Sequence, residues 1–202
     1  MKLSTVLSST LAALTLTLAA TTSAHAAAVT LGDPSYGGSG CPAGSASASL
    51  SPDGTALSIL FDSFSVEAGG PNANVSRKSC NISIPVKVPN GFSVSLIDAD
   101  YRGFVDVPKG SSARLDTEYF FAGSQGPKFS STFTGPFSNS YTKSHQLAAS
   151  SNIWSACGAS VNLRVNSGMM VRAGRGAEAL ASVDSADFKS GVVYHVQYRP
   201  CR

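Results

Sequence analysis

Apolar residues recur at every second position along much of the chain, which is the period of a strand buried on one face. Between residues 80 and 88, every even-numbered residue is apolar or cysteine, and every odd-numbered residue is polar or proline. No window keeps the 3.6-residue period of a helix for ten residues; the best candidate, residues 144–154, is short and rich in serine. The pattern predicts an all-β protein. Further alternating segments are residues 57–61, 92–96, 113–121, 159–165 and 192–198.

Short turns rich in glycine and proline separate the predicted strands. Asn90-Gly91 stands between residues 80–88 and 92–96, and this dipeptide is typical of a type I′ β-hairpin. The two segments are therefore predicted to pair with each other. Other predicted turns are Pro52-Asp53-Gly54, Pro108-Lys109-Gly110 and Gly174-Arg175-Gly176.

Two of the predicted strands are irregular. Pro85 has no N–H to donate to a ladder, so its strand should lie at a sheet edge or carry a bulge there. The apolar positions change parity between Phe61 and Phe64, and a bulge near Asp62-Ser63 would return both to the core face.

The first 26 residues have the three-part layout of a secretory signal peptide. They contain one cation, Lys2, then an uncharged stretch rich in Leu, Ala and Thr, and they end on Ala24-His25-Ala26, which fits an A-x-A cleavage site. We therefore expect export and exclude residues 1–26 from the fold. No later apolar segment reaches the length of a membrane span, so membrane insertion is not expected.

The 176 residues after this leader are a suitable length for one domain. Residues 27–40, rich in alanine and glycine, are expected to form a flexible N-terminal arm, and residues 41–202 a single sandwich domain. Residues 122–151, rich in Ser, Gly, Thr and Pro, are expected to be a long surface loop. After the leader there are 14 Lys and Arg against 12 Asp and Glu, a scattered charge too small to suggest nucleic acid as a partner.

Four cysteines follow the leader, and an even count in an oxidising compartment predicts two disulfides. Three pairings are possible. We favour joining the first to the second and the third to the fourth, because each loop then has about 40 residues and contributes roughly 4 kcal/mol in the chain-entropy estimate. No C-x-x-C spacing supports zinc, and no metal or cofactor is expected. The cysteines are Cys41, Cys80, Cys157 and Cys201.

Many short strands with glycine turns and paired cysteines predict an antiparallel β-sandwich, immunoglobulin-like in general architecture. A closed β-barrel is the alternative. The sequons Asn74-Val75-Ser76 and Asn81-Ile82-Ser83 permit N-glycosylation if the host is eukaryotic. Asn81 falls on the polar face of its strand, where a glycan has room.

No catalytic residues are expected. A triad needs a serine or cysteine within reach of an imidazole, but the cysteines are expected to be paired and no G-x-S-x-G segment occurs. His195 lies on the strand face opposite three apolar side chains, where an exposed or rim position is expected, and His145 lies in the polar 122–151 segment.

The segment DADYRGFVDVPKG, residues 98–110, crowds acids around Arg102. Asp98 and Asp100 are two positions apart, so both should point to one side of an extended chain, with Arg102 at the same parity. Together with Glu118 they form a candidate polar cluster, which could be a carboxylate pair for glycoside hydrolysis or a set of calcium ligands. We favour a surface salt bridge at a strand exit, because Arg102 would neutralise one acid.

One aromatic residue is a candidate for a surface contact, and another is expected to be packed. Phe120 falls on the polar face of residues 113–121, so it is a contact candidate if it is exposed. Trp154 lies three residues before Cys157, and it is expected to pack against a disulfide.

Eight sequence blocks, in order, resemble the secreted-protein family catalogued as domain of unknown function 4360, which is found in filamentous fungi and some bacteria. The resemblance runs from about residue 38 to 201 and implies a secreted, cysteine-paired product without an established activity. It supplies no catalytic residues. The blocks are GSGCPAGS, SPDGTALSILFDSFSVEAG, RKSCNISIPVKVPNGFSV, DADYRGFVDVPKG, EYFFAG, TGPF, WSACGASVNLRVN and SVDSADF.

These observations favour a non-enzymatic extracellular protein that acts by surface binding, as an effector or elicitor at a host boundary or as a cell-wall-associated protein. The expected partner is an extracellular protein, such as a host defence protein, or a cell-wall polysaccharide. The alternative is a carbohydrate-binding module or weak polysaccharide hydrolase that uses the Asp98, Asp100 and Glu118 acids.

Overall fold

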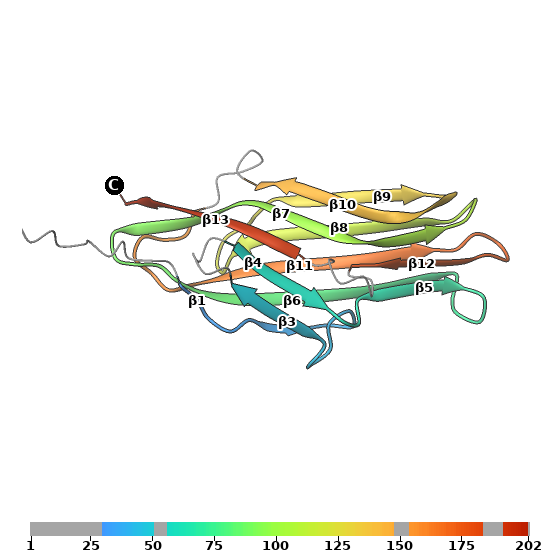
Figure 1. The fold of residues 1–202 in the computed structure, drawn as a ribbon, viewed down its shortest axis with the longest axis horizontal. Coiled ribbons are helices and arrows are strands. Elements are labelled where there is room, and N and C mark those ends of the chain that lie inside the picture. The colour runs from blue at the N-terminus through green and yellow to red at the C-terminus, as the bar shows by residue number, and fades with distance from the viewer. Residues whose placement is uncertain (1–29, 51–55, 148–153, 184–191, 202) are drawn as a thin grey trace, which may run out of the picture.

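The computed structural model describes residues 30–50, 56–147, 154–183 and 192–201. The predicted leader and the Pro52-Asp53-Gly54 turn lie outside these residues. The described part consists mainly of antiparallel strands (Figure 1). Their bounds are β1 Thr30–Leu31, β2 Ser35–Gly37, β3 Ala46–Leu50, β4 Ala56–Phe61, β5 Ser65–Gly69, β6 Val75–Lys87, β7 Phe92–Val107, β8 Ser112–Phe121, β9 Lys128–Thr134, β10 Phe137–Gln146, β11 Val161–Arg172, β12 Glu178–Ser182 and β13 Val192–Pro200.

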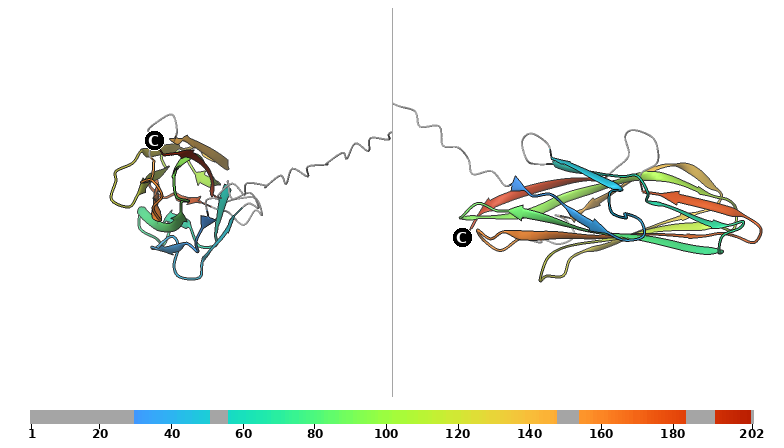
Figure 2. Two further views of the ribbon diagram at one scale, coloured as in Figure 1. Left: turned by 90° about the vertical axis from the view of Figure 1, so that its left-hand side faces the viewer. Right: turned by 90° about the horizontal axis from the view of Figure 1, so that it is seen from below.

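The strands form two sheets that run along the long axis of the molecule (Figure 2). The β6 sheet has the order β1-β6-β11-β8-β9, and β2 also pairs with β6. The β7 sheet has the order β3-β4-β13-β7-β12-β5, and β10 pairs with β7. Within the described residues neither sheet closes on itself. The predicted all-β sandwich is confirmed, and the barrel alternative is wrong.

The core lies between the two sheets and follows the period of two. On β8 the odd-numbered residues 113–121 are buried and the even-numbered ones face outward, and β7 shows the same alternation over residues 99–107. Each large apolar side chain that leaves water contributes roughly 1.5–3 kcal/mol. The largest fully buried side chains are Tyr101, Tyr119, Phe61, Phe64, Ile59, Ile82, Ile84, Leu115, Leu147, Met169 and Val66.

The Asn90-Gly91 turn is present, but it does not close a hairpin. The amide N–H of Phe92 donates to the carbonyl of Pro89 at 3.1 Å, and Gly91 has a φ of 81°, so residues 89–92 form a hydrogen-bonded β-turn. The strands on either side of this turn, β6 and β7, belong to different sheets. The hairpin prediction is therefore wrong, because a local turn signal does not select the ladder partner.

Two segments predicted to lack strands contain them. Residues 27–40 include β1 and β2, which pair with β6. Residues 122–151 include β9, which pairs with β8, and β10, which pairs with β7. Their many serines and threonines hide an alternation in which Phe133 and Tyr141 point into the core. The expected long loop is therefore wrong over β9 and β10, and the expected N-terminal arm contains β1 and β2.

The region around residue 62 is a break between strands rather than the predicted bulge. β4 ends at Phe61 and β5 begins at Ser65. Phe61 and Phe64 both lie in the core, with ring centroids 5.6 Å apart in a T-shaped contact. β6 is not an edge strand, because β1 and β2 pair with it on the side away from β11, and its register with β11 is continuous through Pro85. The prediction of an edge or a bulge at Pro85 is therefore wrong; Pro85 falls between the β6 residues that pair with β1 and those that pair with β2.

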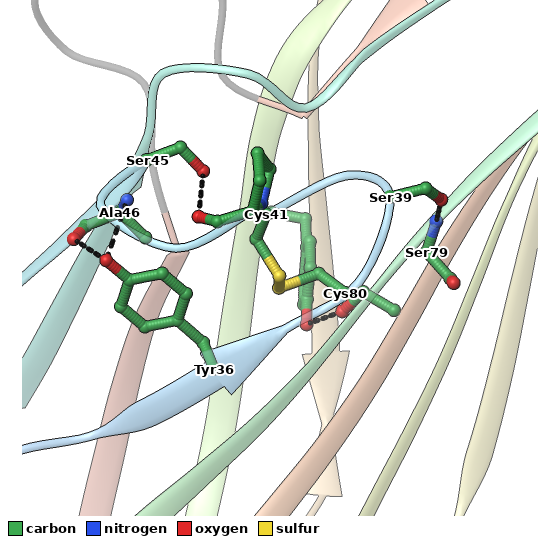
Figure 3. Close-up of a disulfide and its surroundings, with 10 residues drawn as sticks. Tyr36, Ser39, Cys41, Ser45, Ala46, Ser79 and Cys80 are labelled. Carbon is green, nitrogen blue, oxygen red and sulfur yellow. Dashed lines mark hydrogen bonds between the residues drawn. A yellow bond between two sulfur atoms is a disulfide. The ribbon is translucent and has the colours of Figure 1, made fainter.

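Both favoured disulfides are formed. Cys41–Cys80 ties the segment between β2 and β3 to β6 (Figure 3), and both of its residues are fully buried. Next to it the Tyr36 hydroxyl donates to the Ala46 carbonyl at 2.8 Å, and the Ser79 amide N–H donates to Ser39 Oγ at 3.1 Å. Cys157–Cys201 joins the segment before β11 to the end of β13, in a more exposed position.

Candidate functional site

The acidic block DADYRGFVDV lies within the long strand β7 rather than at a strand exit. Tyr101, on the inner face of β7, is fully buried, whereas its neighbours Asp100 and Arg102 face outward. Arg102 takes part in neither of the two ion pairs found among the described residues. The side chain of Asp98 lies outside the described residues. Arg102 therefore makes no ion pair with Asp100, and a salt bridge with Asp98 stays a prediction.

Glu118 lies on the other side of the sandwich from Asp100. Tyr101 of β7 and Tyr119 of β8 both point inward, with ring centroids 6.4 Å apart. Because side chains alternate along a strand, Asp100 and Glu118 point away from each other, one out of each sheet. The candidate cluster is thus divided, and these two carboxylates cannot act on one ligand.

A polar groove, which the sequence did not predict as a unit, lies on the outer face of the β6 sheet. One row across it is Asn81 on β6, Asn166 on β11, Glu118 on β8 and Lys128 on β9, each opposite its neighbour in the ladder. The groove encloses about 530 Å³, and it also contains Arg77 and Arg114. We call it the β6-sheet groove. The next row along the strands is Ser79, Gly168, Asp116 and Ser130.

Both acids in the β6-sheet groove are held by neighbouring side chains. Arg114 contacts Asp116 with Nε and Nη2, each 3.0 Å from Oδ2, and Ser130 Oγ donates to Oδ1 of the same carboxylate at 2.7 Å. Lys128 Nζ lies 3.3 Å from Oε1 of Glu118, and Asn166 Nδ2 donates to Oε2 at 3.2 Å. These contacts order the groove side chains across three strands.

Gly168, which has no side chain, leaves room on the floor of the groove for Arg77. A Cβ at this position would lie 3.0 Å from Nη2 of Arg77 and 3.4 Å from its Nε, so the guanidinium lies directly over the glycine. Gly168 is buried although it is on the outer face. Arg77 makes no ion pair within the described residues, and its donors therefore remain available.

Phe120 and Asn81, two predicted surface residues, belong to this same face. Phe120 is half-buried and lies opposite Arg164, one row beyond Glu118. Asn81 is exposed and lines the β6-sheet groove, whereas Asn74, the other sequon residue, is exposed in the loop before β6. The guanidinium of Arg199 lies 4.0 Å from the ring centroid of Trp154, so this ring makes a cation–π contact.

A buried histidine lies between the sheets, where the sequence predicted a polar loop. His145 is 5% exposed at the end of β10. Its Nδ1 is 2.8 Å from the Tyr119 hydroxyl and 3.2 Å from Thr117 Oγ1, and its ring stacks on Phe129 at 4.4 Å. Burial lowers the pKa of His145 from 6.5 to about 4, partly opposed by the charge of Asp100 and assisted by that of Lys143. Nearby, the Tyr101 hydroxyl bonds Ser167 Oγ at 2.8 Å.

These contacts make His145 a structural residue of the interior. The side chain of His195, the histidine predicted to be exposed or at a rim, lies outside the described residues, so that prediction is not tested. Among the described residues, no group of three or more His, Cys, Asp or Glu side chains is arranged to hold a metal ion.

Comparison with known proteins confirms the resemblance seen in the sequence blocks. A family model described as Domain of unknown function (DUF4360) matches residues 27–201. The chain is also 34% identical over 169 residues to an uncharacterized secreted protein of Arthroderma benhamiae, an alignment that covers 82% of this chain and 69% of the relative. In the part of the chain that the structure describes, no helix has the length and apolar character needed to cross a bilayer.

Proposed function

Because the chain belongs to the DUF4360 family, we propose that it is a secreted protein that acts outside the cell by binding and does not catalyse a reaction. The relative from Arthroderma benhamiae is named a secreted protein, and residues 1–26 of this chain have the layout of a signal peptide. Its partner is a cell-wall polysaccharide or an extracellular protein. An effector or elicitor role at a host boundary is one form of this proposal.

The observation that carries the proposal is the β6-sheet groove. Its side chains project from four neighbouring strands that are hydrogen-bonded along their length, so the groove is held rigid before any ligand arrives. Preorganisation of this kind reduces the entropy lost on binding. Its polar side chains, supported by the Cys41–Cys80 disulfide on β6, suit recognition of a polar surface.

The arrangement of acids argues against the alternative of a weak hydrolase. A glycosidase needs one carboxyl group that can donate a proton and a second one facing the same bond. Asp100 and Glu118 face opposite ways. Asp116 and Glu118 do share the groove, but each contacts a cation, Arg114 or Lys128, so neither is placed as a proton donor.

A polysaccharide panel tests the absence of catalysis. Protein incubated with chitin, β-glucan and pectin is expected to release no reducing ends above a heat-treated sample, because the two acids that share the groove are each paired with a cation. Asp100→Asn is expected to leave retention on every polymer unchanged, since Asp100 lies on the face opposite the groove. Release of reducing ends that Asp100→Asn or Glu118→Gln abolishes would show that the protein is an enzyme.

A glycan on Asn81 would stand within the β6-sheet groove, whereas one on Asn74 would not. In protein from a glycosylating host, Ser83→Ala removes the Asn81 sequon without changing Asn81 itself, and it is expected to lower the mass by one glycan and to raise ligand retention. Ser76→Ala, which removes the Asn74 sequon, is the matched control and should leave retention unchanged. Equal retention by the two variants would contradict the placement of the binding surface.

A further inference from the structure

Basic side chains are concentrated on the outer face of the β6 sheet. Six lie there, against two acids, whereas the described outer face of the β7 sheet carries four acids and two basic side chains. The sandwich is therefore electrically two-sided. On the β6 sheet the basic residues are Arg77, Lys87, Arg114, Lys128, Arg164 and Arg172. On the β7 sheet the acids are Glu67, Asp100, Asp106 and Glu178, and the basic residues are Arg102 and Arg199.

Most of the positive charge on the β6-sheet face is not neutralised within the protein. Asp116 and Glu118 are each matched by one cation of the same face. The other four basic residues make neither an ion pair nor a side-chain hydrogen bond within the described residues. A surface with one excess sign of charge attracts ligands of the opposite sign. The four are Arg77, Lys87, Arg164 and Arg172.

Arg77 is placed to recognise a single carboxylate. It lies over Gly168, with Nη2 3.0 Å from where a Cβ would be, and a larger residue there would displace it. A guanidinium presents paired donors that match the two oxygens of a carboxylate, and such charge-assisted hydrogen bonds are stronger than neutral ones. At this position the pairing would take place on the groove floor.

The residues between the cations can bond sugar hydroxyls. Asn81 and Asn166 are neighbours in one row, and Ser79 and Ser130 belong to the next. Amides and hydroxyls both donate and accept hydrogen bonds, as sugar hydroxyls do. From β6 to β9 the groove crosses three strand spacings, about 14 Å, which is long enough for more than one sugar unit.

We propose that the β6-sheet groove binds a polysaccharide built from uronic acids. Its carboxylates pair with Arg77 in the groove and with Arg164 and Arg172, which project from β11 on either side of it, and its hydroxyls bond the asparagine and serine side chains. This inference rests on the proposed function, because it names the ligand class for the same surface.

The composition of the face favours this polymer over other polyanions. Single-stranded nucleic acid is held by stacking on exposed aromatic rings, but the aromatic side chain that this face offers among the described residues of β6, β8, β9 and β11 is the half-buried Phe120. Sulfated polymers carry more negative charges per unit length than the four separated cations of this face can pair with. A chain with one carboxylate for each sugar combines sparse charge with many hydroxyls.

Calorimetric titration with de-esterified polygalacturonate tests the inference. The processed protein, residues 27–202, is expected to bind it, less tightly as salt rises, and to bind the fully methyl-esterified polymer at least tenfold more weakly. Arg77→Gln is expected to weaken binding about tenfold. Gly168→Val keeps every charge and is expected to weaken binding similarly by displacing Arg77. Arg102→Gln makes the same change on the opposite face, and its affinity for polygalacturonate is expected to stay within about twofold of that of the native protein.

The results separate this inference from the proposed function. Equal binding of the esterified polymer, or preference for a neutral glucan, overturns the uronate ligand and leaves a secreted binding protein. Tighter binding to dextran sulfate or DNA that Gly168→Val does not alter would show unspecific charge attraction and overturns it too. Failure to bind any polysaccharide or extracellular protein overturns both. Thermal melting monitors folding, and Arg77 is exposed, so Arg77→Gln and the ester comparison remain decisive if Gly168→Val unfolds.

Discussion

Replacement of Cys41 and Cys80 together by alanine is expected to lower the free energy of unfolding by about 4 kcal/mol or more. The bridge closes a loop with a sequence separation of 39, and its loss returns that conformational freedom to the unfolded chain. Both cysteines also lie in the core at 0% exposure, so alanine leaves a cavity there. Urea unfolding followed by tryptophan fluorescence and circular dichroism measures the change.

The second bridge is the matched control. Cys157–Cys201 has a sequence separation of 44, so chain entropy alone predicts an almost equal loss. Its cysteines are partly exposed, and their replacement adds little cavity cost. We therefore expect Cys157→Ala with Cys201→Ala to destabilise the protein less. Equal losses for the two pairs would show that loop closure accounts for the whole effect and that the buried position of Cys41–Cys80 adds nothing.

Acidification from pH 7 to pH 4 is expected to destabilise the fold through His145 by about 3 kcal/mol. Burial lowers the pKa of His145 to about 4 in the folded protein, against 6.5 when exposed. Between pH 6.5 and 4 the imidazole is therefore protonated in the unfolded chain but neutral in the folded protein. This contribution to stability is complete above pH 6.5. It falls as the pH drops from 6.5 to 4, and below that both states are protonated and no further loss follows.

A variant without the imidazole isolates this effect from the titration of carboxylates. His145→Phe keeps a ring to stack on Phe129 but loses the bonds from Tyr119 and Thr117, so it should be less stable at pH 7. Between pH 6.5 and 4 its stability should decline less than that of the native protein, as measured by urea unfolding at a series of pH values. Parallel decline of the two proteins would exclude His145 as the acid-sensitive group.

The strands that were predicted best are those whose alternation is uninterrupted. β6, β8 and β11 follow the apolar period because one face of each meets the core, and burial of that face depends only on local spacing. β9 and β10 were missed because polar residues, many of them serine or threonine, occupy most of their positions. Both strands lie at the edge of a sheet, where a few inward-facing apolar side chains are enough to hold a strand against the core.

The candidate site was predicted only in parts. Asn81, Glu118 and Phe120 were each expected on an outward face, and they are outward. Their assembly with Arg77 and Asn166 follows from the β6-β11-β8 ladder, which places Asn166 between Asn81 and Glu118, residues far from it in the sequence. Glu118 is separated from the Asp98, Asp100 and Arg102 segment for the same reason, because β7 and β8 belong to different sheets.

The amino-acid sequence by itself determined the strands with an uninterrupted alternation, their inward and outward faces and the cysteines available for pairing, because these depend on residue type and on a period of two. Only the tertiary structure decided that β6 and β7 separate, that His145 is interior and that the basic residues gather on one face. Those outcomes depend on which strands share hydrogen bonds, and every strand offers the same backbone donors and acceptors to any partner.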